Sequence, residues 1–156
     1  MFVMTARVNK KKIFGLLAVA AGLILLLTLL LGSGGDAAST AAPSMATNDG
    51  RVQFLKDFGW DVAASPVESG QVRIPETASE LFDRYNTLQK SQGYDLSKYA
   101  GKTVMRYVYK IGNYPGATDP VYATLLVYKD QVIGGDITDT SATGKIQGFR
   151  MATQSP

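Results

Sequence analysis

The chain has 156 residues with no cysteine and no histidine, and its 16 Lys and Arg against 13 Asp and Glu give a formal net charge of +3. Without a thiol or an imidazole it cannot form a serine–histidine–aspartate triad, a cysteine–histidine pair, or a thiolate or imidazole zinc site. The positive excess comes from Arg7, Lys10, Lys11 and Lys12, so the remaining chain has no basic patch that would predict nucleic-acid binding.

Residues 13–31 form an uncharged apolar run whose one polar side chain is Thr28. As a helix this run would be roughly 28 Å long, close to the hydrocarbon thickness of a bilayer. We expect an uncleaved, single-pass transmembrane helix in contact with the lipid bilayer. A cleaved secretory signal is the alternative, although its apolar region would normally be about 7 to 15 residues long.

The charges on either side of this run predict its orientation. The basic tail, residues 1–12, precedes the run, whereas Asp36 and Asp49 follow it. Basic flanks stay in the cytoplasm, so the tail is expected inside the cell and everything after Leu31 outside it. An outer domain that uses no disulfide is common in bacterial envelopes, which favours the cell membrane of a bacterium as the location.

Residues 32–47 are rich in Gly, Ala, Ser and Thr and predict a flexible linker. Residues 48–156 then have the length of one small extracytoplasmic domain. Asn48 or Asp49 is expected to cap a short helix that ends at Gly59, with Trp60 packing back onto Leu55. Residues 60–67 and 71–74 predict two strands around a turn at 68–70, and the proline at 66 restricts the first to an edge or a broken strand.

Residues 77–92 give the clearest helical pattern. The order Thr-Ala-Ser-Glu over residues 77–80 fits a capping box, and Gly93 is a natural stop. The spacing predicts one buried stripe, made of Ala78, Leu81, Phe82, Tyr85 and Leu88. Residues 96–99 predict one more helical turn after an aspartate cap at position 95.

The next segments alternate as strands do. Residues 103–111 place Met105, Tyr107 and Tyr109 on one face, which predicts a half-buried strand. Residues 121–128 are apolar on both faces and are expected at the centre of the sheet, followed by a tight turn and a strand over 131–137. Short connections require antiparallel strands, so we predict an α+β domain with the long helix packed on an antiparallel sheet.

Six sequence blocks in this region resemble those of a known family. They lie within residues 54–60, 74–76, 85–99, 113–116, 125–129 and 132–136. In combination they resemble the bacterial family called domain of unknown function 4830, over about residues 51–150. The resemblance implies an anchored extracytoplasmic protein of Gram-positive type with no assigned activity, and it supplies no catalytic residues.

Carboxylates are the remaining candidates for chemistry. A glycosidase needs two carboxyl groups about 5 to 9 Å apart, and Asp136 with Asp139 or Asp61 with Asp95 are open choices that no spacing selects. Oxygen ligands for calcium at 136 and 139 are too few, so no metal and no cofactor are expected. Among the tyrosines, Tyr94, Tyr114 and Tyr122 are the better contact candidates, because the others are expected in the core.

These observations favour a non-catalytic binding or accessory module at the envelope, whose partner is an unknown envelope protein or wall component. A carboxylate-dependent wall hydrolase is the alternative, and it requires a cleft with two facing carboxyls, one of them desolvated. Adjacent glycines within a strand mark a bulge or a close approach. The predicted contact surface is Gly134, Gly135 and Asp136, together with Asn113 and Tyr114 on a turn that the antiparallel strands could bring near. The alternative is that the glycines only make room for the long helix or for an aromatic ring such as Phe82 or Tyr85.

Overall fold

The computed structural model describes residues 43–151. The expected transmembrane helix at 13–31, the basic tail and most of the linker lie outside these residues, so the membrane prediction stays a prediction. Within residues 43–151, no helix has the length and apolar character needed to cross a bilayer.

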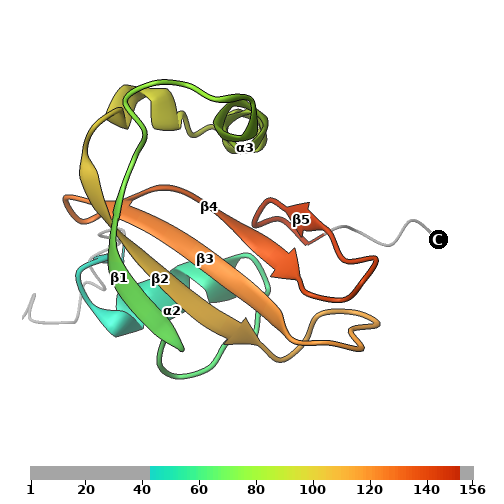
Figure 1. Ribbon diagram of the computed structural model, residues 1–156. Helices are drawn as coiled ribbons and strands as arrows, with labels where there is room; N and C mark the ends of the chain where they lie inside the picture. Colours follow the sequence, from blue (N-terminus) through green and yellow to red (C-terminus); the bar gives the residue numbers. More distant parts are fainter. Residues whose placement is uncertain (1–42, 152–156) are drawn as a thin grey trace, which may run out of the picture. The chain divides into compact units, whose positions relative to one another are not determined.

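One antiparallel sheet of five strands forms the frame of the domain (Figure 1), and the strands lie in chain order. They are β1 (Glu68–Arg73), β2 (Thr103–Ile111), β3 (Val121–Tyr128), β4 (Gln131–Asp139) and β5 (Ile146–Gln147). The predicted α+β class is confirmed, and so is the central place of β3. Between β3 and β4, Lys129 and Asp130 both adopt positive φ angles of 46° and 64°, as a tight hairpin turn requires.

Helix α2 (Asn48–Asp57) begins one residue earlier than the expected caps allow. Thr47 is the N-cap, and its hydroxyl accepts a hydrogen bond from the Gly50 N–H at 3.1 Å. The predicted end is confirmed. Gly59 has a φ of 90°, and the N–H of Trp60 donates to the Leu55 carbonyl at 3.2 Å, which closes the helix end and buries Trp60 beside Leu55.

The strand predicted at 60–67 and the turn at 68–70 are wrong, whereas the strand predicted at 71–74 is confirmed for residues 71–73 as the second half of β1. The strand β1 runs straight through the residues expected to form the turn, and Ser69 pairs with Tyr107 of β2. Before β1, the chain forms an isolated bridge between Val62 and Ile111, and the N–H groups of Ala63 and Val67 also donate to carbonyls of β2. Pairing with β2 satisfies the backbone of residues 68–70, so their local turn preference does not decide their structure.

Helix α3 (Glu80–Ser91) is followed by the short 3₁₀ helix η1 (Leu96–Tyr99). The predicted capping box is wrong, because the N-cap is Ser79, whose hydroxyl accepts from the Phe82 N–H at 3.2 Å. The predicted buried stripe is only partly right, since Leu81 is 79% exposed. The buried positions of the helix are instead Asn86 and Gln89.

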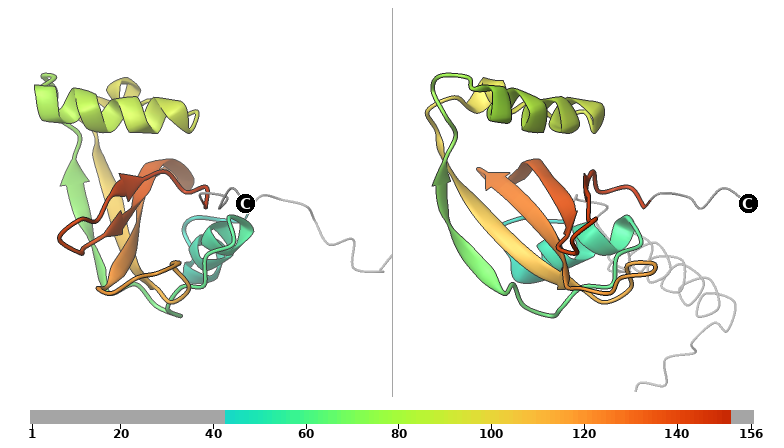
Figure 2. Two further views of the ribbon diagram at one scale, coloured as in Figure 1. Left: turned by 90° about the vertical axis from the view of Figure 1, so that its right-hand side faces the viewer. Right: turned by 45° about the vertical axis from the view of Figure 1, so that its right-hand side comes forward.

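The two faces of the sheet carry separate cores (Figure 2), with α2 on one face and α3 with η1 on the other. The α2 side holds the larger core, which includes Leu55, Trp60, Tyr109, Leu125, Ile137 and Phe149. The α3 side holds a smaller one of Ile74, Leu96, Val104, Leu126 and Ile133. The smaller core leaves part of the sheet on the α3 side without a helix above it.

Candidate functional site

Asn113 and Tyr114 hold the loop after β2 against the segment that follows α2. The Asn113 side chain accepts from the Asp61 N–H and donates to the Gly59 carbonyl, both at 2.8 Å. The Tyr114 ring stacks on Trp60 with centroids 5.9 Å apart, and its hydroxyl donates to Gln147 Oε1 at 3.3 Å. Both side chains are therefore occupied in joining loops to the core.

The two glycines of β4 face opposite sides of the sheet, and each lies under a close neighbour. A Cβ on Gly134 would lie 2.9 Å from Gln89 Oε1 and 3.1 Å from a Leu96 methyl, on the α3 side. A Cβ on Gly135 would overlap the Thr124 carbonyl and the Phe149 ring, and its φ of 155° disfavours any other residue. The glycines thus accommodate Gln89, Leu96 and Phe149, and not the rings of Phe82 or Tyr85.

Asp136 is a buried carboxyl on the α3 side, with 6% of its surface exposed. One oxygen accepts from the Tyr85 hydroxyl at 2.7 Å and the other from the Thr138 hydroxyl at 2.6 Å. Burial raises the pKa of Asp136, although these two hydrogen bonds and the charge of Arg106 act to lower it. Burial and the neighbouring Asp136 also raise the pKa of Tyr85 far above its usual range, so this phenol stays protonated.

The five predicted contact residues do not form one surface. Asp136 and Gly134 face the α3 side of the sheet, where Asp136 lies opposite Thr124 of β3. Tyr114 packs with the core on the α2 side, and Asn113 is bonded to the loop beside it. The expectation that the β2–β3 turn comes near Asp136 on the same surface is therefore wrong.

A shallow groove crosses four strands on the α3 side of the sheet, with a volume of about 310 Å³. We call it the sheet groove, and it is lined by Val67, Glu68, Arg106, Val108, Tyr122, Thr124 and Thr138. Arg106 forms an ion pair with Glu68 at 2.5 Å. The lining includes Tyr122, one of the predicted contact tyrosines. Sequence reasoning missed Arg106 and Thr124, although strand alternation did place Arg106 on the face away from the aromatic core.

Carboxylates in the described part of the chain do not gather into a metal site. Among residues 43–151, no group of three or more Asp and Glu side chains is placed to hold an ion. Asp95 is used as a cap, and hydrogen bonds from Ser97 and Asn86 lower its pKa to about 2. The described carboxylates that form contacts serve individually as caps, ion-pair partners and buried hydrogen-bond acceptors.

Comparison with known proteins gives one match. The family described as Domain of unknown function (DUF4830) matches residues 54–137, from α2 into β4. The chain belongs to this family. The match includes α3, Asp136 and its hydrogen-bond donor Tyr85, and it ends one residue before Thr138. Neither the curated proteins nor the solved structures give a match.

Proposed function

We propose that this DUF4830 domain is the outer part of a membrane-anchored, non-catalytic binding module at the bacterial cell envelope. The anchor is the apolar run at 13–31, and the linker at 32–47 gives the domain freedom to reach its partner. The basic tail at 1–12 directs the domain outward. The binding surface is the sheet groove.

The state of Asp136 is the observation that carries the non-catalytic assignment. A general acid in a glycosidase must present its proton to the substrate across a cleft from a second carboxyl. Asp136 is the desolvated carboxyl of the α3 side, but both of its oxygens are occupied by hydroxyl groups of the protein. The groove itself is lined by one carboxylate, Glu68, which is paired with Arg106.

The chemistry of the groove suits a polar wall component rather than an apolar partner. Its lining includes two hydroxyl-bearing residues, Tyr122 and Thr124, beside the ion pair of Glu68 and Arg106. Hydroxyl and amide groups, which wall glycans carry in large numbers, can exchange hydrogen bonds with such a surface. Because the groove is open and shallow, we expect weak binding that many groups along a polymer would strengthen together.

Sedimentation with purified cell walls tests this function. The full chain in detergent micelles should sediment with the walls and release no soluble sugar fragments. Tyr122→Ala should reduce the bound fraction, whereas Thr87→Ala, on the exposed outer side of α3, should not. Release of reducing sugar that Asp136→Asn abolishes would show a hydrolase instead, and sedimentation no better than without walls would contradict wall binding.

A further inference from the structure

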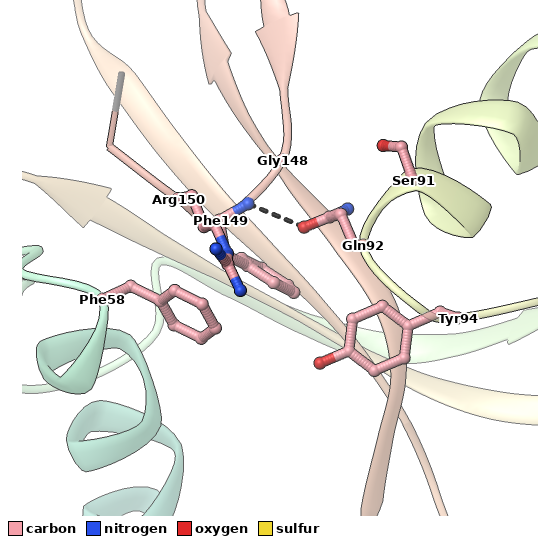
Figure 3. Close-up of a pocket in the computed structure, with 7 residues that line it drawn as sticks. All are labelled: Phe58, Ser91, Gln92, Tyr94, Gly148, Phe149 and Arg150. Carbon is pink, nitrogen blue, oxygen red and sulfur yellow. Dashed lines mark hydrogen bonds between the residues drawn. The ribbon is translucent and has the colours of Figure 1, made fainter. Parts of the chain in front are cut away.

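A second cavity lies where the end of α2, the end of α3 and the segment after β5 meet (Figure 3). It has a volume of about 290 Å³. We call it the aromatic pocket, and it is lined by Phe58, Ser91, Gln92, Tyr94, Gly148, Phe149 and Arg150. These residues come from the end of α2, the end of α3 and the segment after β5. The size is at the small end of the range for ligand pockets and suits a single ring with a short substituent.

The backbone of Phe149, which forms one wall of the pocket, is fixed by hydrogen bonds to Gln92 and Trp60. Phe149 is 1% exposed, and its N–H donates to Gln92 Oε1 at 2.7 Å. Its carbonyl accepts from the Trp60 indole at 2.6 Å. The Gln92 amide is itself anchored, because its nitrogen donates to the Gly135 carbonyl at 3.0 Å. The pocket wall is therefore held in place before any ligand arrives, which lowers the entropic cost of binding.

Three aromatic rings line the pocket beside its polar groups. The ring of Phe58 lies 5.5 Å from that of Phe149, and the ring of Tyr94 meets Phe149 edge-on at 6.3 Å. Such offset and edge-to-face contacts are the geometry that aromatic rings favour. A fourth ring between Phe58 and Tyr94 would extend the same arrangement. Figure 3 shows these two side chains on opposite sides of the space.

Two polar groups at this space are left without partners in the described part of the chain. The Tyr94 hydroxyl makes no hydrogen bond with residues 43–151 and points across the pocket toward Phe58 (Figure 3). Burial raises the pKa of Tyr94, so the phenol is a neutral donor at physiological pH. Arg150 lines the pocket and takes part in none of the ion pairs formed within residues 43–151.

We propose that the aromatic pocket binds a small aromatic carboxylic acid. The ring of the ligand lies between Phe58 and Tyr94, and its carboxylate pairs with the Arg150 guanidinium and accepts a hydrogen bond from the Tyr94 hydroxyl. A guanidinium recognises carboxylate geometry with paired donors. This site is separate from the sheet groove and does not depend on wall binding.

Other ligand chemistries fit the pocket less well. A quaternary ammonium is the usual guest of an aromatic cage, but here Arg150 would repel it and no acidic side chain lines the pocket. A sugar acid could pair with Arg150, yet its several hydroxyls would find few partners. Ser91 donates to the Leu88 carbonyl, and the Gln92 amide is already engaged. Unpaired hydroxyls would then oppose binding of the sugar.

Ligand binding to the full chain in detergent micelles tests the proposal. The probe is 3-phenylpropionate, followed by saturation-transfer NMR and by fluorescence of Trp60, which is the one tryptophan of the chain and is bonded to Phe149. For a ligand of this size we expect a Kd on the order of 1 mM or tighter. Glucuronate lacks the arene and benzyl alcohol lacks the charge, so each should bind at least about tenfold more weakly.

Two variants separate recognition from nonspecific uptake. Arg150→Gln should weaken 3-phenylpropionate by about tenfold or more, and Tyr94→Phe, which keeps the ring, by about threefold. Arg73→Gln is the matched control, because Arg73 lies on β1 and is paired with Glu76. Unchanged urea unfolding of each variant shows that the fold is intact. Equal affinity of wild type and Arg150→Gln, tighter binding of glucuronate, or no saturable binding by about 20 mM would overturn the proposal.

Discussion

Buried polar side chains connect the segments of this domain. Arg51 is 6% exposed, and its guanidinium lies 3.7 Å above the ring of Tyr107. It also donates to the Tyr109 hydroxyl at 2.9 Å and to the Met45 carbonyl at 2.7 Å. A charge buried this way is stabilised by the ring and by several hydrogen bonds together. Arg51 therefore joins α2 and the segment before it to β2.

Replacing Gly135 tests the most restricted backbone position of β4. Gly135→Ala would bring a methyl group into the Thr124 carbonyl and the Phe149 ring, at a backbone conformation that alanine disfavours. We expect a loss of about 2–4 kcal/mol in the free energy of unfolding by urea. Gly70→Ala is the matched control in β1, where a Cβ would meet nothing within 4 Å. It should be neutral or slightly stabilising, and equal losses for both variants would contradict this account.

The pH dependence of stability tests the burial of Asp136. Its pKa is raised in the folded protein, so folding takes up a proton between the unfolded pKa of about 4 and the folded pKa. The stabilisation from Asp136 is therefore present at low pH and lost as the pH rises through the folded pKa. Asp136→Asn stays uncharged, so its stability relative to wild type should increase from pH 4 to pH 7 in urea unfolding.

Asp95 provides a control of opposite sign for this experiment. Hydrogen bonds from Ser97 and Asn86 lower its pKa to about 2, so its contribution is present above about pH 4 and is lost as the pH falls toward 2. Asp95→Asn should therefore lose stability relative to wild type as the pH rises from 2 to 4. A constant difference between Asp136→Asn and wild type across pH 4–7 would show that Asp136 is not desolvated.

The roles of these residues were only partly predictable from the sequence. The paired glycines correctly indicated a close approach in β4, but the approaching groups, Gln89 and Phe149, come from distant positions. Nothing in the local pattern shows that Asn113 bonds to the segment after α2. Hydrogen bonds between residues far apart in sequence depend on how the elements pack, which a local pattern does not encode.

At the scale of elements, α3 shows how a polar helix face can be the buried one. Asn86 accepts from the Leu96 N–H at 2.8 Å, and Gln89 accepts from the Gly135 N–H at 2.8 Å. Together with Gln92, Gln89 satisfies the backbone of β4 where the short β5 leaves its edge unpaired. Hydropathy therefore predicts the packed side of α3 only in part, since Phe82 and Tyr85 do pack on the core, but it misses Asn86 and Gln89, whose partners lie on other elements.

Leucine truncations test which side of α3 and η1 is packed. Leu81 is 79% exposed, so Leu81→Ala should change the free energy of unfolding by less than about 0.5 kcal/mol. Leu96 is 1% exposed in the α3-side core, and Leu96→Ala should cost about 2–5 kcal/mol. Urea unfolding of the two variants side by side gives the comparison. A large loss for Leu81→Ala would mean that α3 is rotated relative to this structure.

The residue pattern predicted β2 and β3 well. One face of β2 and both faces of β3 carry mostly apolar side chains, and burying them fixes the register of each strand. The same reasoning predicted only the second half of β1, whose residues are mostly exposed and include Gly70. An edge strand needs no apolar alternation, because only its partner strand holds it in place. The sequence therefore predicts the centre of this sheet better than its edge.

At the scale of the whole molecule, the domain combines a compact two-sided core with open surfaces on separate sides. The sheet groove lies on the α3 side, and the aromatic pocket lies between the ends of α2 and α3. Both would be exposed on the outer side of the membrane if residues 13–31 anchor the chain as proposed. The location of the domain relative to the membrane is therefore the central claim.

Cysteine labelling in intact cells tests this claim directly, because the chain has no cysteine and so gives no background. Thr87→Cys places a thiol on the exposed side of α3, and Thr5→Cys places one in the basic tail. A membrane-impermeant maleimide should label Thr87→Cys in intact cells and Thr5→Cys only after the membrane is permeabilised. Labelling of Thr5→Cys in intact cells, with Thr87→Cys protected until permeabilisation, would contradict the account.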